Sequence, residues 1–166
     1  KHWGEPIPNM SEGRRTALQM VVRVLMFSGM RPIEVFRLEK GHVTEKSIHI
    51  VGSKTQSSTR VVPLHPELKD FPTWFNENGM AAFSSITTDK VSSLRHNFIM
   101  LIRGKIDPPI LDPQKGLYSL RTTFVNAMRR AGADIQMQRA ILGHKEAGAI
   151  RHYDDGPEFD KKYKAV

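Results

Sequence analysis

Cysteine is absent from the 166 residues of this chain. Its absence excludes disulfide bonds, zinc sites built on thiolates and catalysis by a cysteine nucleophile. Long apolar runs are also lacking, and none approaches the roughly 20 residues that a membrane-spanning helix needs. Internal repeats and low-complexity tracts are missing too. What remains, 39% hydrophobic and 25% charged residues, predicts one ordinary globular domain with its own core.

Several familiar motifs of catalysis are missing as well. The stretch Gly52-Ser53-Lys54-Thr55 lacks the glycine directly before the lysine that a phosphate-binding Walker loop requires. No serine-hydrolase elbow, zinc-protease helix motif or metal-spaced run of aspartates occurs, so we predict neither a cofactor nor a metal. Four scattered histidines are interpreted as surface or strand residues rather than ligands: His42, His49, His65 and His96.

Acidic residues are outnumbered by basic ones. The chain has 25 Lys and Arg against 17 Asp and Glu, which gives a formal net charge of +8. The sequence pI of about 9.9 exceeds the value of about 9 that is typical of nucleic-acid-binding domains. Composition alone leaves an incidentally basic domain equally open, so the positions of the charges have to decide.

The first third of the chain predicts two helices. Apolar residues recur three and four positions apart on one face of the first: Leu18, Val21, Val22 and Leu25. Asn9 or Ser11 is its expected N-cap, and Gly29 ends it. A second, short helix opens at Arg31, with Pro32 in its first turn.

A hairpin follows these helices. Residues 47–51 and 60–64 alternate or cluster apolar residues as strands do, and the polar stretch 52–59 between them reads as the turn. We expect 43–44 as a third strand. Helices are then predicted over 66–78, where Asn78-Gly79 is a turn signal, and over 88–103. The predicted fold class is α+β, mainly helical, with a small antiparallel sheet of about three strands.

The C-terminal third predicts three more helices. The first is expected to begin at Ser119 as its cap and to close at Gly132. The second begins at Asp134 and ends at Gly143, and a third, short helix covers residues 145–153. A tail follows from residue 157.

Five residues stand at special positions in this pattern. Arg31 follows a helix end, Lys54 lies at the hairpin tip, Arg121 lies near a helix start, and His144 directly follows a helix-ending glycine. Tyr153 comes nine positions after His144. Two guanidinium groups can grip one phosphate through paired hydrogen bonds. A tyrosine phenol titrates near pH 10, so a strongly electropositive pocket would be needed to make it a nucleophile.

This constellation resembles the catalytic domain of the tyrosine recombinase (phage integrase) family. Three stretches carry the resemblance: Ser-Gly-Met-Arg-Pro-Ile-Glu-Val-Phe-Arg-Leu at 28–38, Gly-Ser-Lys through Arg-Val-Val-Pro-Leu at 52–64, and Tyr-Ser-Leu-Arg through Leu-Gly-His-Lys to His-Tyr at 118–153. Each alone is weak, but all three occur in order and together span nearly the whole chain.

The resemblance implies a role for each residue. Arg31 and Arg121 would clamp the scissile phosphate, and His144 would hydrogen-bond it. Lys54 would protonate the departing 5′ oxygen, and Tyr153 would attack phosphorus to give a 3′-phosphotyrosine. Neither ATP nor a metal is needed, because the ester to the protein preserves the energy of the phosphodiester bond. Electrostatic positioning is the main catalytic lever in such reactions.

The resemblance also implies a supporting role for Glu34, and the sequence departs from the family pattern at Tyr118. Glu34 would hold Arg31 in position. The family commonly places histidine three residues before the second arginine, where this chain has Tyr118, a poor proton acceptor at neutral pH. General-base help would then come from His144 or water. Tyr163 is the rival nucleophile, and no base-reading role is assigned to three other arginines: Arg129, Arg130 and Arg139.

The resemblance also implies partners and an arrangement of the chain. We expect an arm at 1–10, a catalytic domain at 11–156 and a tail at 157–166 that docks on a neighbouring protomer. Because the chain begins with lysine, we expect a fragment whose N-terminal DNA-binding domain is missing. Double-stranded DNA, a homotetramer on that DNA, no membrane and a bacterial cytoplasmic location complete the expectation. Two alternatives stay open, a non-catalytic DNA-binding module on the same fold and a related tyrosine topoisomerase.

Overall fold

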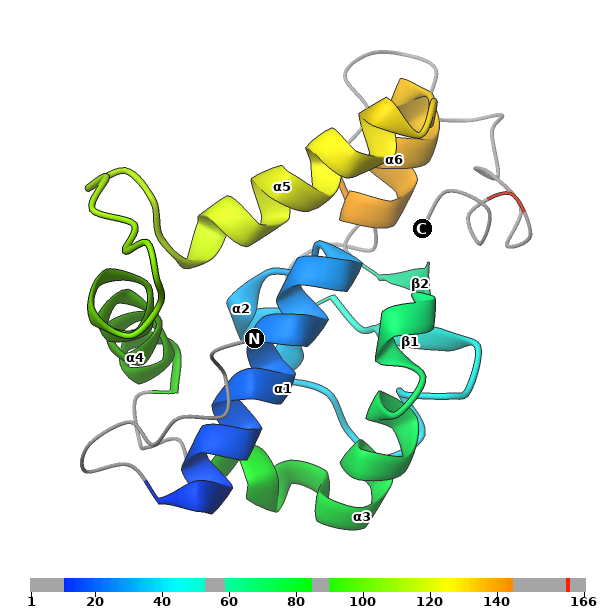
Figure 1. Ribbon diagram of the computed structural model, residues 1–166. Coiled ribbons are helices and arrows are strands. Elements are labelled where there is room, and N and C mark those ends of the chain that lie inside the picture. The colour runs from blue at the N-terminus through cyan, green and yellow to red at the C-terminus, as the bar shows by residue number, and fades with distance from the viewer. Residues whose placement is uncertain (1–10, 53–58, 85–89, 145–160, 162–166) are drawn as a thin grey trace.

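A long central helix, α1 (Glu12–Ser28), organises the computed structural model, which describes residues 11–52, 59–84, 90–144 and 161. Figure 1 shows α1 with α3 (Phe71–Ser84) below it, α4 (Lys90–Gly104) to one side, and α5 (Leu117–Arg130) and α6 (Ile135–Leu142) above it. The four apolar residues expected on its inner face are all buried: Leu18, Val21, Val22 and Leu25. The helix is therefore confirmed, with Ser11 as its N-cap and Gly29 as its C-cap.

Gly29 lets the chain leave α1 in a direction that other residues rarely take. Its φ of 61° lies in the left-handed region. A Cβ there would clash with the ring of Phe124 on α5, so glycine also allows α1 and α5 to approach closely. Three residues later α2 (Pro32–Val35) begins, with Arg31 as its N-cap and Pro32 in its first turn, as predicted.

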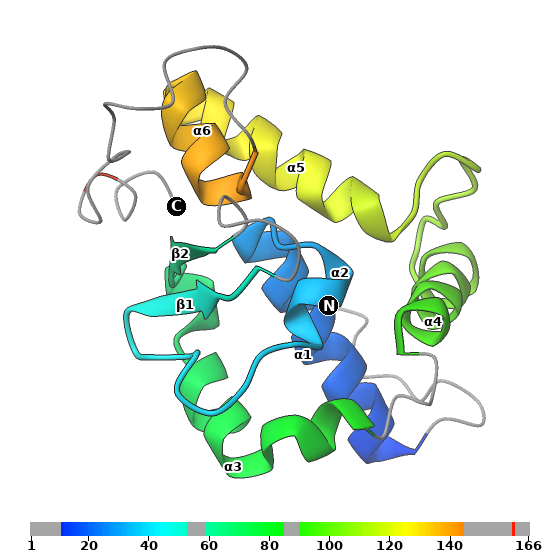
Figure 2. The ribbon, with the colours of Figure 1, turned by 180° about the vertical axis from the view of Figure 1, so that it is seen from behind.

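The sheet consists of β1 (Ser47–Ile50) and β2 (Arg60–Pro63), paired antiparallel with Ile50 opposite Arg60. The expected third strand is wrong for the described residues. Val43 makes only an isolated bridge to Ile48, because Thr44 donates its N–H to the carbonyl of Ser47 and turns the chain at once. Figure 2 shows the hairpin from behind, beside α2.

The middle of the chain forms a short 3₁₀ helix, η2 (Pro66–Leu68), then α3 (Phe71–Ser84) and α4 (Lys90–Gly104). The predicted helix end at Asn78-Gly79 is wrong, because α3 continues to Ser84. A glycine inside a helix costs only about 1 kcal/mol. Phe71 and Phe75, both fully buried one turn apart, anchor α3 to the core.

The last two described helices are α5 (Leu117–Arg130) and α6 (Ile135–Leu142). Ser119 is not the N-cap of α5; it lies inside the first turn, where its hydroxyl accepts the N–H of Gly116. The prediction for α6 is confirmed: the Asp134 carboxylate accepts the N–H of Met137 at 2.7 Å, and Gly143 caps the other end. The helix expected over 145–153 lies outside the described residues.

These results confirm a mainly helical domain with a small antiparallel sheet. In the part of the chain that the structure describes, no helix is both long enough and apolar enough to span a membrane. The C-terminal end of α1, the start of α2, the start of β2 and the end of α6 come together at one place (Figure 1). The side chains with the greatest chemical interest lie there.

Candidate functional site

Arg31 and Glu34 are brought together by the local geometry of α2. Arg31 is the N-cap and Glu34 the third residue of the helix, a spacing that lets the carboxylate reach back to the cap. The Glu34 carboxylate accepts the backbone N–H of Arg31 at 2.7 Å, and its Oε1 accepts from Arg31 Nη1 at 2.9 Å. The Arg31 side chain nonetheless keeps 35% of its surface exposed, so it remains accessible to a ligand.

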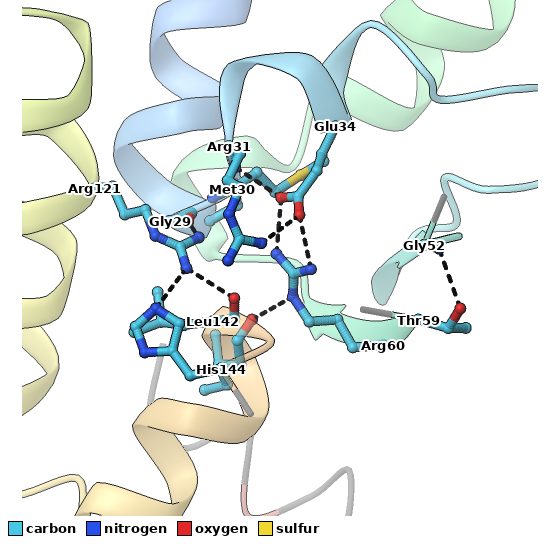
Figure 3. Close-up of polar contacts among 12 residues, drawn as sticks. Gly29, Met30, Arg31, Glu34, Gly52, Thr59, Arg60, Arg121, Leu142 and His144 are labelled. Atoms are coloured by element: carbon cyan, nitrogen blue, oxygen red, sulfur yellow. Dashed lines mark hydrogen bonds and ion pairs between the residues drawn. The ribbon is translucent and has the colours of Figure 1, made fainter. Parts of the chain in front are cut away.

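Arg60 binds the same carboxylate from the other side. Its Nη1 and Nη2 donate to Glu34 Oε1 and Oε2 at 3.0 and 2.9 Å, a paired geometry, and its Nε donates to the carbonyl of Ile141 at 2.7 Å. Figure 3 shows the guanidinium of Arg60 between Glu34 and the end of α6. Only 7% of the residue is exposed, so this cation is almost wholly withdrawn from water.

The surroundings of Glu34 keep it ionised. Burial alone would raise the pKa of Glu34, but the hydrogen bonds and charge of Arg60, followed by those of Arg31, hold it below its ordinary value. The carboxylate is therefore negatively charged at neutral pH. It offsets part of the positive charge around it and fixes the directions of two guanidinium groups.

Arg121 joins the ends of two helices. It projects from the second turn of α5, where Nη1 donates to the carbonyl of Gly29, the C-cap of α1. Its Nη2 donates to the carbonyl of Leu142, in the last turn of α6, at 2.8 Å. Helix C-termini present carbonyls without partners and a negative dipole end, so a cation is stabilised there.

His144 is held beside Arg121 by the turn that ends α6. Gly143 has a φ of 65°, and His144 donates its backbone N–H to the carbonyl of Arg139 at 3.0 Å. The ring Nε2 lies 3.0 Å from Nη2 of Arg121. Because a guanidinium only donates, Nε2 must accept, which places the ring proton on Nδ1. Burial and then the charge of Arg121 lower the pKa of His144 below 6.5, so the ring is neutral at pH 7.

The site carries more positive than negative charge. Three arginines (Arg31, Arg60 and Arg121) gather around one carboxylate, which gives +3 − 1 = +2 with His144 neutral. Burial first, and then the charges of Arg31 and Arg60, lower the pKa of Arg121 to about 10. A site that disfavours one of its own cations to this extent is relieved by an anion. Its donors suit a phosphate group.

The remaining predicted site residues lie elsewhere or outside the described chain. Lys54 and Tyr153, and the rival Tyr163, fall among residues that the structure does not describe. Tyr118 lies on α5 one turn before Arg121, and 63% of it is exposed. It lines a groove of about 470 Å³ between α4 and the start of α5, together with Arg95 and other residues. The structure shows no hydrogen bond from Tyr118 to any of the five described site residues, which are Arg31, Glu34, Arg60, Arg121 and His144.

The sequence pattern does not predict a role for Arg60 in the site. A signal for it existed, because strand residues two apart face the same side and Val62 is apolar. An arginine on the buried face of a strand requires a carboxylate or carbonyl partner. Its actual partners lie 26 and 81 residues away in the sequence, so spacing alone does not identify them.

Metal ligands do not gather in the part of the chain that the structure covers. No group of three or more histidine, aspartate or glutamate side chains there is arranged to hold a metal ion. The described members of the site are instead cations, one carboxylate and a neutral imidazole.

Comparisons with known proteins add one likeness. No family model matches the chain, and no curated protein matches it by sequence. Among solved structures, the XerH site-specific recombinase, bound to its difH substrate in a pre-cleavage complex, superposes with a TM-score of 0.59 at 18% identity. The alignment covers 95% of this chain but 44% of that protein. The chain therefore has a fold similar to that of part of a site-specific recombinase.

Proposed function

We propose that this chain is the catalytic domain of a site-specific DNA recombinase, which cuts and rejoins strands by transesterification. The observation that carries the proposal is the cationic cluster on this fold. Arg31, Arg121 and His144, which the sequence resemblance assigned to the phosphate, lie together with Arg60 and Glu34 in one cluster whose net charge is +2. Such preorganised donors stabilise the charge that develops on a phosphate during transfer.

Each described residue has a part in this reaction. Arg31 and Arg121 bind the non-bridging oxygens of the phosphate. His144 donates from Nδ1, because its Nε2 already accepts from Arg121. Glu34 holds Arg31 in place through two hydrogen bonds. The lone pair on Nε2 of the neutral His144 ring already accepts a hydrogen bond from Arg121, so His144 cannot act as the base. Water therefore takes the phenol proton of the nucleophile.

The chemical step uses residues outside the described chain. The phenol oxygen of Tyr153 forms a bond to phosphorus, and the bond from phosphorus to the 5′ oxygen breaks. Lys54 supplies the proton that the leaving 5′ oxygen takes up. A 3′-phosphotyrosine and a free 5′-hydroxyl result, and attack by another 5′-hydroxyl reverses the step. No ATP or metal is consumed, because one ester replaces another.

The proposal extends to partners. The recombinase of similar fold was captured with a DNA substrate, and the net charge of +8 favours binding to phosphates. This chain spans less than half of that recombinase. We therefore propose that a further DNA-binding domain closes around the duplex, that four copies assemble on the DNA, and that residues 157–166 dock on a neighbouring copy.

Covalent capture on DNA tests the function. The protein, with any further domain that it carries, is incubated with a library of nicked duplexes of random sequence. Complexes that survive SDS are then isolated and sequenced. We expect an SDS-resistant protein–DNA band from the wild type and from the matched control Tyr163→Phe, and no band from Tyr153→Phe.

The other outcomes identify the alternatives. A band that persists in Tyr153→Phe but disappears in Tyr163→Phe assigns the nucleophile to the tail. Duplex binding without any covalent band overturns the proposed enzymatic function and favours a non-catalytic DNA-binding module. Tyr118, which replaces the family's usual histidine, would then be the first residue to test as the cause of the lost catalysis. If a covalent band forms, plasmid relaxation without strand exchange between two duplexes indicates a topoisomerase.

A further inference from the structure

Arg60 connects the two halves of the cationic cluster. Through Glu34 it is linked to Arg31 at the start of α2. Through the carbonyl of Ile141 it is linked to the last turn of α6, the turn that ends at His144. The two halves are the Arg31–Glu34 pair and the Arg121–His144 pair. Among the described residues, no hydrogen bond joins one pair directly to the other. Arg60 therefore bridges them.

The contact with α6 is too close to be incidental. A Cβ on Gly143 would come 2.8 Å from Arg60 Nη1 and 3.0 Å from its Cδ. The backbone of the turn thus lies directly on the Arg60 side chain. Arg60 and Arg121 also bind two successive carbonyls of α6. Arg60 donates to the carbonyl of Ile141, and Arg121 donates to that of Leu142. A shift of the Arg60 side chain would therefore move the turn that carries His144.

We propose that Arg60 is a positioning residue that aligns Arg31 and His144 on one phosphate, an inference that deepens the proposed function and rests on it. Arg60 is 7% exposed and binds no phosphate itself. Its paired bonds fix the Glu34 carboxylate, which orients Arg31, while its Nε fixes the end of α6. Lysine cannot replace it, because an ammonium group lacks the planar fork that reaches a carboxylate and a carbonyl at once.

The test measures anion binding separately from DNA cleavage. Inorganic phosphate is titrated into wild type, Arg60→Lys and the matched control Arg23→Lys, with affinity read by calorimetry. Arg23 makes the same kind of paired contact, to both oxygens of Asp70 at 2.8 Å and to the carbonyl of Glu67, but between α1 and the segment before α3. We expect Arg60→Lys to weaken phosphate binding by about tenfold or more, because Arg31 then loses the fixed carboxylate that orients its charge-assisted hydrogen bonds to the anion. Arg23→Lys should leave the affinity unchanged.

A second readout separates positioning from mere support of the fold. The ¹⁵N shifts of the His144 ring report which nitrogen carries the proton. In folded Arg60→Lys, whose unfolding is checked by thermal melting, we expect these shifts to change although lysine at position 60 retains the charge. Wild-type affinity together with unchanged ring shifts in the folded variant overturns the proposal.

Three further outcomes are decisive. If Arg60→Lys does not fold, Glu34→Gln, which retains the shape of the side chain, takes its place; wild-type phosphate affinity there overturns the inference. Absence of phosphate binding by the wild type also overturns it. If Arg60→Lys loses phosphate affinity while the wild type captures no DNA covalently, the positioning role stands and the proposed function fails.

Discussion

Glu34 accepts four hydrogen bonds, from the backbone and side chain of Arg31 and from both terminal nitrogens of Arg60. A carboxylate offers about four lone-pair positions, so its capacity is filled. Burial of a charge is costly unless every position is satisfied in this way. At the scale of single residues, Glu34 thus fixes the orientation of two guanidinium groups, those of Arg31 and Arg60.

Glu34→Gln tests this dependence through pH. Removing one partner from a buried ion pair should lower the free energy of unfolding at pH 7 by about 3 kcal/mol. The pKa of Glu34 lies below its ordinary value of 4.5. Its stabilisation is therefore present above pH 4.5 and is lost as the pH falls through the folded pKa. Urea unfolding over a series of pH values should show the wild type and the variant converging in acid.

Asp70→Asn is the control for this prediction. Hydrogen bonding by Arg23 also lowers the pKa of Asp70, but that side chain is 51% exposed. Exposed pairs contribute at most about 1 kcal/mol, so its loss should be smaller. A difference between wild type and Glu34→Gln that stays constant with pH would contradict the explanation.

At the scale of elements, the site is an assembly of helix ends. The C-termini of α1 and α6 supply carbonyls to Arg121 and Arg60, and the start of α2 supplies Arg31. Both C-termini end in a glycine of positive φ, which turns the chain sharply and leaves the carbonyls accessible. The negative dipole ends of α1 and α6 thus face the cations.

Gly143→Ala tests the turn that ends α6, with Gly132→Ala as its matched control. Both glycines have positive φ, where a side chain costs about 1 to 2 kcal/mol. An added Cβ at Gly132 meets nothing within 4 Å, whereas one at Gly143 meets Arg60. Thermal unfolding and phosphate titration should show a stability loss alone for Gly132→Ala, and a larger loss with weaker binding for Gly143→Ala. Equal effects of the two would contradict the contact.

Comparison with the sequence-based predictions shows what local signals can establish. Periodicity and caps located α1, α2 and α6, because each is specified by residues within its own span, as Asp134 shows. The predicted end of α3 is wrong because a helix tolerates an internal glycine at a cost of about 1 kcal/mol. The predicted start of α5 is wrong because the helix already begins at the buried Leu117. The role of Arg60 could not be predicted from the sequence, because its hydrogen-bond partners Glu34 and Ile141 are distant in the chain and meet it only after folding.

At the scale of the whole molecule, charge is in excess both overall and locally. The chain carries +8, and the cluster carries +2 around a single carboxylate. The lowered pKa of Arg121, at about 10, reflects its burial and the neighbouring arginines. The folded protein therefore holds these arginines at an electrostatic cost, and we expect a bound anion to reduce it.

Sulfate should for this reason stabilise the protein more than chloride at the same ionic strength. Ligand that binds only the folded state adds about 2.7 kcal/mol at a concentration of 100 times Kd. Thermal melting of wild type, Arg31→Gln and the control Arg130→Gln measures the effect. The increment specific to sulfate should vanish in Arg31→Gln and persist in Arg130→Gln. Equal stabilisation by chloride, or an increment that persists in Arg31→Gln, would contradict an anion site.

Three of the acceptors that hold the arginines are main-chain carbonyls, at Gly29, Ile141 and Leu142. Mutation cannot remove a carbonyl; it can only displace the helix that presents it. A lineage can therefore exchange most of its side chains and still inherit this cradle, as long as the helices keep their places. Such a site leaves a faint record in the sequence and a clear one in the backbone.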